Sequence, residues 1–303
     1  MFHHFVTCLV QSEYMYSLEN DRLKIEVSSK GAELGSLVSK DTGTEYLWSG
    51  DATYWAKKSP VLFPIVGTLK DDTYIYNNNS YKLTRHGFAR DMDFTKTGQS
   101  DVSLTMTLES TEETLAKFPF PFKLDIIYSL ENDRLHVDYH VSGTGGDNMY
   151  FSIGAHPAFK IPLEEGLIYE DYYFEFEQNE NALRWLISGE GLINPAAVPI
   201  LTDSKKLPVT RDLFTKDAVV LKHLNSEKVY LKSDKSTHGV EFDFPRFPFL
   251  GLWTAKGGNF VCIEPWCGIA DSTTTNQDFV NKEGINLLTP GEIFKRRWSV
   301  RIF

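Results

Sequence analysis

Alternation of apolar and polar side chains at period two recurs along this chain and limits what it can fold into. The segment DVSLTMTLES (101–110) alternates in this way. The C-terminal segment FKRRWSVRIF (294–303) does so too, and it places on one side Phe294, Arg296, Trp298, Val300 and Ile302. A side-chain period of two matches a strand with one buried face and does not match a helix. We therefore predict an all-β, mostly antiparallel chain.

Turn residues between the alternating segments predict hairpins. The octapeptide YSLENDRL occurs at 16–23 and again at 128–135, and alternation follows each copy. Its Asn and Asp residues tolerate left-handed backbone and bond locally, so each copy predicts a hairpin. The segment YIYNNNSYKL (74–83) is interpreted as strand, turn and strand. GTGGDN (143–148) is interpreted as a further hairpin loop, because it lacks the strand and helix that flank a dinucleotide fingerprint.

Helical signals are few and short. STEETLAKFP (110–119) begins with a capping box from Ser110 to Glu113 and stops before Pro119, while TNQDFVNKEG (275–284) has room for two helical turns. No Gly/Ser-rich or Pro-rich linker divides the chain, so we predict one large twisted β-sandwich domain over residues 15–303. Regular patterning begins only at Met15, and we expect residues 1–14 to be a poorly ordered extension.

Charge and composition exclude several classes of protein. The 303 residues include 31 basic and 41 acidic side chains, a net charge of −10, which disfavours nucleic acid and anionic membrane surfaces as partners. No apolar run is long enough to span a bilayer. Three cysteines are too few for a secreted disulfide scaffold, and no Lys or Arg precedes the N-terminal apolar run as in a secretory signal. We expect a cytoplasmic monomer or homodimer.

Two of the eight histidines stand in settings that suit a site. His86 in RHGFARD precedes Gly87, so the backbone can turn tightly where the imidazole is presented. His156 in SIGAHPAFKIP follows Gly154 and precedes Pro157, which biases it towards extended backbone. For each of these two, a structural role and a site role are equally open at this point. The other six are interpreted as solvated, sheet-surface or loop residues.

A glutamate between two cysteines is the third candidate. In NFVCIEPWCGIAD (259–271) alternation predicts a strand that Pro265 ends, with Cys262 and Glu264 on one face. A carboxylate at the end of an apolar strand is costly unless something uses it. Zinc would need more ligands than two isolated thiols, and a disulfide is disfavoured in a reducing compartment. We interpret Glu264 as functional and Cys262 and Cys267 as packing, with no metal.

Several segments in order resemble the aldose 1-epimerase (galactose mutarotase) superfamily, and most of all its bacterial LacX-like branch. They are PVLFPIVGTLKDD, HGFAR, IGAHPAF, VTRDLFTKDAVVL, LGLWT, CIEPWCGIAD and LTPGE, and the resemblance runs from Met15 to Phe303. It implies a large antiparallel β-supersandwich and the interconversion of sugar anomers without a cofactor. Opening and closing a sugar ring needs one acid and one base, and His and Glu suit these roles.

Carried over residue by residue, the resemblance implies specific roles. His156 in GAHP matches the family's general acid and Glu264 in IEPW its general base. His86 in HGFAR resembles the auxiliary histidine that holds the sugar. Asp217 in KDAVVL is similar to the aspartate that orients hydroxyls, and Trp253 in LGLWT to a pocket wall.

One position departs from the family. An arginine often follows the glycine of the VG motif, where this chain has Thr68. With that departure and the net charge of −10, we expect neutral aldoses to be preferred over hexose 6-phosphates. Arg85 and Arg90, beside His86, are the opposing signal, because two arginines can bind a phosphate. A hexose-6-phosphate mutarotase is therefore a second possible function.

The sequence is also compatible with a non-catalytic protein and with a hydrolase. A non-catalytic carbohydrate-binding or sensor protein would share the motifs without the turnover. A glycoside hydrolase would need a pair of carboxylates at the scissile bond, for which Glu264 with Asp271 or with Asp217 is conceivable.

Overall fold

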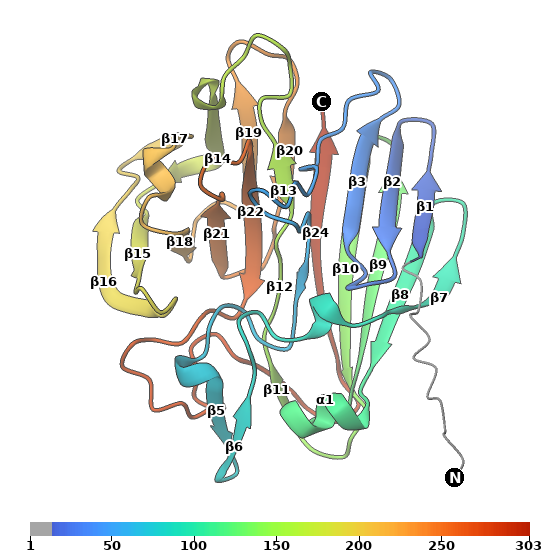
Figure 1. The fold of residues 1–303 in the computed structure, drawn as a ribbon, viewed down its shortest axis with the longest axis vertical. Helices are drawn as coiled ribbons and strands as arrows, with labels where there is room; N and C mark the ends of the chain where they lie inside the picture. Colours follow the sequence, from blue (N-terminus) through green and yellow to red (C-terminus); the bar gives the residue numbers. More distant parts are fainter. Residues whose placement is uncertain (1–13) are drawn as a thin grey trace, which may run out of the picture.

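The computed structural model describes residues 14–303, which form two large antiparallel sheets with smaller sheets beside them (Figure 1). One large sheet has nine strands, in the spatial order β17 (Ser204–Pro208), β14 (Tyr172–Glu180), β19 (Lys228–Ser233), β20 (Val240–Asp243), β24 (Ile293–Ile302), β10 (Arg134–Gly143), β9 (Phe122–Glu131), β8 (Ser103–Glu109) and β7 (Thr95–Gln99).

The second large sheet carries the candidate site. Its order is β16 (Ile193–Pro199), β15 (Leu183–Ile187), β18 (Val219–Lys222), β21 (Phe249–Trp253), β22 (Phe260–Cys267), β12 (Ile153–Ala155) and β4 (Val61–Leu62), with β13 (Ala158–Lys160) also paired to β22. The smaller sheets are β1 (Met15–Glu19) with β2 (Leu23–Ser28) and β3 (Leu34–Ser39), β5 (Thr73–Tyr76) with β6 (Asn79–Lys82), and β11 (Met149–Phe151) with β23 (Asn286–Leu288).

The main core lies between the facing sides of the large sheets. On β22, Val261 and Ile263 point into this core, and on β20 Val240 and Phe242 do so from the other sheet. The rings of Phe159 and Phe242 meet across it, with centroids 6.0 Å apart. Large apolar side chains packed from two sheets supply most of the stabilisation of such a sandwich.

The predicted fold class is confirmed. Every pairing between strands named here is antiparallel, and α1 (Glu112–Lys117) is the one α-helix within residues 14–303. Both copies of the repeated octapeptide form hairpins, between β1 and β2 and between β9 and β10, and 74–83 forms the β5–β6 hairpin. No helix in this part of the chain has the length and apolar character needed to cross a bilayer. Residues 1–13 of the expected extension lie outside the described residues.

Three local predictions were wrong. The cap of α1 is Thr111, whose hydroxyl accepts from the Thr114 N–H, because the Ser110 hydroxyl instead accepts from the backbone of the returning strand at Phe122. Residues 275–284 are not helical, since their backbone bonds to β5 at Ile75. The loop at 143–148 leads to β11 and is not a hairpin, because both edges of β10 are already paired, with β9 and β24.

A fourth local prediction was also wrong, because Pro265 does not end its strand. β22 continues to Cys267, and Pro265 lies opposite Leu250 on β21. On its other edge β22 pairs with β13 up to Cys262 and with β12 from Trp266 onward. Pro265 therefore falls in the gap between two partners, where a missing N–H leaves no ladder bond unmade.

A charge cluster links four neighbouring strands on the outward face of the nine-stranded sheet. The Glu241 carboxylate on β20 accepts from Arg134 at 2.7 Å, from Arg301 at 2.6 Å and from Lys228 at 3.0 Å. The Glu241 side chain is only 6% exposed. Burial raises the pKa of this carboxyl, but the hydrogen bonds from Arg134, Arg301 and Lys228 outweigh it and lower the pKa to about 2.

We predict that Glu241→Gln lowers the free energy of unfolding by about 3 kcal/mol at neutral pH, because three cations lose the negative charge that they share. Arg134 and Lys228 each keep a second ion pair, with Asp243. The folded-state pKa lies below the usual 4.5, so the stabilisation is present above pH 4.5 and is lost as pH falls towards 2. The measurement is urea unfolding at neutral pH and near pH 3. The difference in the free energy of unfolding between wild type and variant should be smaller at the acidic pH. The control Glu26→Gln, in an exposed pair with Lys24, should cost less than about 1 kcal/mol. An equal effect of the two substitutions would contradict the prediction.

Candidate active site

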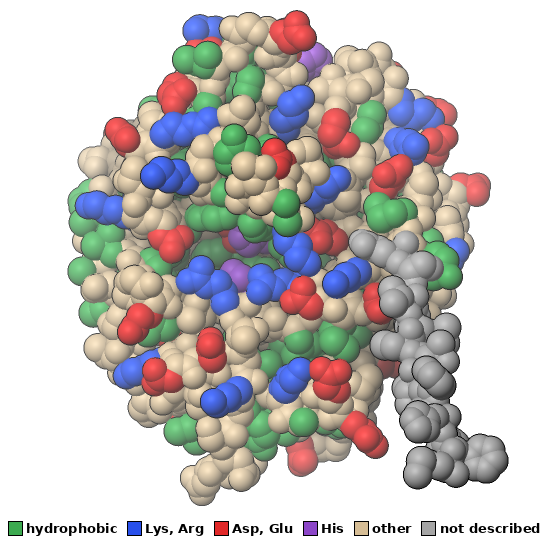
Figure 2. Space-filling view, in the orientation of Figure 1, with side chains coloured by type: hydrophobic (Ala, Val, Ile, Leu, Met, Phe, Trp, Pro, Cys, Tyr) green, Lys and Arg blue, Asp and Glu red, His purple; other side chains and the backbone are tan. Residues whose placement is uncertain are grey.

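A cavity of about 280 Å³ opens on the outer face of the eight-stranded sheet, the face turned away from the main core. In the space-filling view it is a hollow with histidine at its base and Lys and Arg side chains along its lower edge (Figure 2). All seven residues singled out from the sequence line it: Arg85, His86, Arg90, His156, Asp217, Trp253 and Glu264. Its volume is near the lower end for small-molecule sites, which are roughly 300–1,000 Å³.

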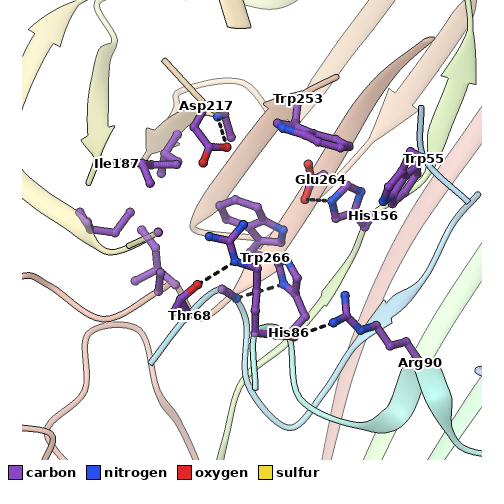
Figure 3. Close-up of a pocket in the computed structure, with 18 residues that line it drawn as sticks. Trp55, Thr68, His86, Arg90, His156, Ile187, Asp217, Trp253, Glu264 and Trp266 are labelled. Carbon is purple, nitrogen blue, oxygen red and sulfur yellow. Dashed lines mark hydrogen bonds and ion pairs between the residues drawn. The ribbon is translucent and has the colours of Figure 1, made fainter. Parts of the chain in front are cut away.

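Strand β22 places Glu264 in this cavity by simple alternation. Val261 and Ile263 face the core, so Glu264 and Trp266 face the opposite side. His156 lies in the break between β12 and β13, the two short strands that pair with β22 in turn. The two side chains meet there, with His156 Nε2 3.2 Å from Glu264 Oε2 (Figure 3).

The pair is buried, and burial acts on its two members in opposite senses. Glu264 is 2% exposed and His156 8%. Burial lowers the pKa of His156 to about 3, and the charges of Arg90 and Arg85 act in the same direction. Burial raises the pKa of Glu264 well above its usual value, and the charge of Asp217 adds to the rise. Both shifts favour the state in which the two side chains share a single proton.

His86 has a defined tautomer. Its Nδ1 accepts a hydrogen bond from the Gly67 N–H at 3.1 Å, so the neutral ring carries its proton on Nε2. Burial, and then the neighbouring His156, lower the pKa of His86 well below 6.5. The two imidazole rings lie edge to face with centroids 5.8 Å apart. His86 is therefore suited to donate a hydrogen bond as a neutral group and not to act as an acid.

Aromatic rings enclose the histidine. The Trp55 ring is tilted by 30° to that of His156 with centroids 4.8 Å apart, and Trp253 meets His156 edge-on with centroids 5.6 Å apart. Trp266 covers the floor of the cavity beside two glycines, Gly154 and Gly251, and a Cβ at either glycine would overlap its ring. Flat apolar faces of this kind suit the C–H groups of a sugar. Sequence reasoning missed Trp55, because no motif surrounds it and only the fold brings it to His156.

Asp217 lies on the far wall from His156 (Figure 3). Its backbone has φ +66°, and its Oδ1 accepts from the Ala218 N–H at 2.8 Å. Arg184 holds this loop by donating to the carbonyl oxygens of Lys216 and Asp217. Asp217 Oδ2 has no hydrogen-bond partner among residues 14–303, so it is available to accept from a ligand hydroxyl.

Three potential metal ligands lie close together at this pair. One donor atom each from His156, Cys262 and Glu264 falls within 4.8 Å of the others. Such a set would suit a metal such as zinc. Cys262 does not line the cavity but packs beside it in a small cluster with Trp48 and Phe260, and burial raises the pKa of its thiol. Cys267 points into the main core. Both thiols are free.

Comparison with known proteins gives consistent matches over nearly the whole chain. The family model described as aldose 1-epimerase matches residues 14–300. The LacX protein encoded on the chromosome of Lactococcus lactis subsp. lactis is 33% identical over 294 residues, which cover 94% of this chain and 98% of that protein. The crystal structure of a galactose mutarotase related enzyme from Lactobacillus acidophilus is 34% identical, with a TM-score of 0.91 and coverage of 96% and 97%. A galactose mutarotase-like protein from Lactobacillus casei is 33% identical, with a TM-score of 0.91 and coverage of 96% and 100%.

We predict that the two buried cysteines are dispensable for turnover of a sugar substrate. Cys262→Ser and Cys267→Ser should each keep most of the activity measured by polarimetry, and a chelator should leave it unchanged. The reason is that Cys262 packs in an apolar cluster and does not line the cavity, and burial raises the pKa of its thiol. Elemental analysis of the purified protein should find no stoichiometric metal. Loss of both a bound metal and activity in Cys262→Ser would contradict this.

Proposed function

The chain belongs to the aldose 1-epimerase family, and we propose that it is an isomerase that interconverts the α and β anomers of an aldohexose by acid–base ring opening, without a cofactor. The observation that carries the proposal is the buried contact of 3.2 Å between His156 and Glu264 in the cavity. A carboxylate and an imidazole in one apolar enclosure supply the base and the acid that this reaction requires.

In the proposed reaction the sugar inserts its anomeric centre beside this pair. Glu264 accepts the proton of the hydroxyl on C1 while His156 gives a proton to the ring oxygen, and the bond between C1 and the ring oxygen breaks. The open-chain aldehyde then rotates about its C1–C2 bond. The ring closes on the other face of the carbonyl as both protons return, so the protein ends in its starting state.

A pair that shares one proton suits this cycle. Ring opening moves a proton onto Glu264 and removes one from His156, so the proton count of the pair stays the same throughout. Burial disfavours the imidazolium of His156 and the carboxylate of Glu264 when each is considered alone. The cavity therefore supports the state with neutral His156 and protonated Glu264, which is the state that follows ring opening.

The remaining side chains support binding. His86 donates through Nε2 to a sugar oxygen, and Asp217 accepts from a hydroxyl on the far wall. Trp55 and Trp253 cover the apolar face of the sugar and keep water from the pair, which strengthens the electrostatic interactions inside.

A glycoside hydrolase would need two carboxylates at the scissile bond, and the contacts of Asp271 disfavour the pair that it would form with Glu264. Asp271 does not line the cavity, and its two oxygens accept from the buried Lys282 ammonium at 2.7 Å and from the Lys70 N–H at 3.0 Å. The pair of Glu264 with Asp217 is tested by release of reducing sugar from an aryl glycoside. A non-catalytic binding protein would bind sugar but leave the rate of mutarotation unchanged.

We predict that Glu264→Gln and His156→Asn each lower kcat by roughly 10²–10⁴-fold, about 3–5 kcal/mol of barrier, because each removes one proton transfer. The double variant should lose much less than the sum of the two, since the pair acts as a unit. The measurement is polarimetry of freshly dissolved α-D-glucose and α-D-galactose, with folding checked by circular dichroism. The matched control Glu112→Gln alters an exposed residue at the start of α1 and should keep the wild-type rate. A folded Glu264→Gln protein with the wild-type rate would falsify the proposal.

We also predict a bell-shaped dependence of kcat/KM on pH with a broad plateau. Activity falls in acid when the pair takes up a second proton, and the lowered pKa of His156 places that limb well below pH 6.5. It falls in base when the pair loses its only proton, and the raised pKa of Glu264 places that limb well above pH 4.5. The limbs report the coupled pair, not single residues. An acidic limb centred near 6.5 would show that His156 titrates as a free imidazole and would contradict this account.

A further inference from the structure

Arg85 presents an unpaired cationic group at the cavity. Its Nε donates to the hydroxyl of Thr68 at 2.8 Å, and within residues 14–303 no carboxylate forms an ion pair with its guanidinium. The two terminal nitrogens of Arg85 have no protein acceptor in the same part of the chain, so the edge that binds a carboxylate or phosphate with two parallel hydrogen bonds is available. Exposed arginines usually point into solvent, but this one is hydrogen-bonded to Thr68 and packs against Gly191.

Gly191 and Thr68 hold the guanidinium in place. Gly191 has φ +82°, and a Cβ there would overlap Nη2 of Arg85 and lie 2.8 Å from the Thr68 hydroxyl. The backbone of Thr68 is in turn tied to Asp271, whose N–H donates to the Thr68 carbonyl oxygen at 2.9 Å. Asp271 is anchored by the buried Lys282. A rigid support of this kind pre-organises a binding group and lowers the entropy lost on binding.

A second arginine adjoins the first. Arg90 lines the same cavity and donates through Nη2 to the Arg85 carbonyl oxygen at 2.9 Å. Its Nε has no hydrogen-bond partner but forms an ion pair with Asp91 Oδ2 at 3.6 Å, so Arg85 is the less neutralised of the two arginines. Thr68, which marks the position of the Arg85 guanidinium, lies across the cavity from His156 and Trp55, and away from Asp217 (Figure 3).

From this arrangement we propose that the sugar substrate carries an anionic group, a carboxylate or a phosphate, remote from its anomeric carbon, and that Arg85 binds it in the position fixed by Thr68 and Gly191. The inference rests on the proposed function for the identity of the ligand as a sugar. It reverses the expectation of a neutral aldose that the net charge of −10 suggested, because local charge at the cavity decides recognition.

Binding of methyl glycosides tests the inference separately from catalysis. A methyl group on the anomeric oxygen removes the proton that Glu264 would accept, so these ligands bind without reacting. Calorimetry would compare the methyl glycosides of glucose and galactose with their C6 carboxylates and their 6-phosphates. We expect one class of anion to bind at least roughly tenfold more tightly than the neutral glycoside, and the better class identifies the group as carboxylate or phosphate.

Variants assign the effect to Arg85. Arg85→Met should reduce the preference for the charged ligand to less than about threefold, and Thr68→Val should reduce it in part by releasing the guanidinium. The control Arg22→Met removes the same charge from an exposed surface pair with Asp41 and should keep the preference. Any one of three outcomes would overturn the inference. These are equal affinity for neutral and anionic glycosides, no binding of either anion, and a preference for the anion that survives Arg85→Met.

The outcomes separate this inference from the proposed function. A protein that binds the charged glycosides through Arg85 but does not accelerate mutarotation of the matching free sugars refutes the isomerase proposal alone. A protein that accelerates mutarotation only of neutral sugars refutes the anionic-group inference alone.

Discussion

The placement of β22 between two environments determines where Glu264 lies and where His156 meets it. One side of this strand, with Val261 and Ile263, is sealed in the core between the large sheets. The other side must then face away from the core, and it carries Glu264 and Trp266. A one-residue slip would bury the carboxylate in the core and expose the apolar side chains, so the core fixes the register of the site. The rigidity of the site thus comes from the packing behind it.

The pairing of β22 also explains the break between β12 and β13. Because β22 pairs with two short strands in succession, the chain between them leaves the sheet at His156 and Pro157. The imidazole is delivered there to the side of β22 that carries Glu264. Pro265 is tolerated at the same gap, where no partner needs its missing N–H. The proposed acid, the proposed base and the interrupted strand pairing therefore belong to one structural feature.

Much of this was predictable from the sequence, and the failures have local causes. Period-two alternation predicted the β class and the burial pattern of β24. The small residues around His156 and the cost of a carboxylate in an apolar strand made each residue a candidate, and the family resemblance paired the two as acid and base. The helix expected at 275–284 failed because bonds to β5, distant in sequence, outweighed weak local propensity. Trp55 was missed for a similar reason, since its contact with His156 exists only in three dimensions. The local charge at the cavity was not predictable from the net charge, because a count of residues cannot show that Arg85 lacks an acidic partner among residues 14–303.

The Trp266 ring rests against the chain at Gly154 and Gly251, with no room for a side chain at either glycine. These three residues lie on adjacent strands, β12, β22 and β21, so the depth of the cavity is fixed by three positions together. A smaller residue at 266 would deepen the floor and leave a void next to Gly154 and Gly251. A larger residue in place of either glycine would have to displace the Trp266 indole. A change in the size of the ligand accepted would thus require linked substitutions. A single substitution at the floor would create either a void or a steric clash and would destabilise the protein. Divergence of specificity within such a scaffold is expected to proceed through the loops around the rim, where side chains can be exchanged one at a time.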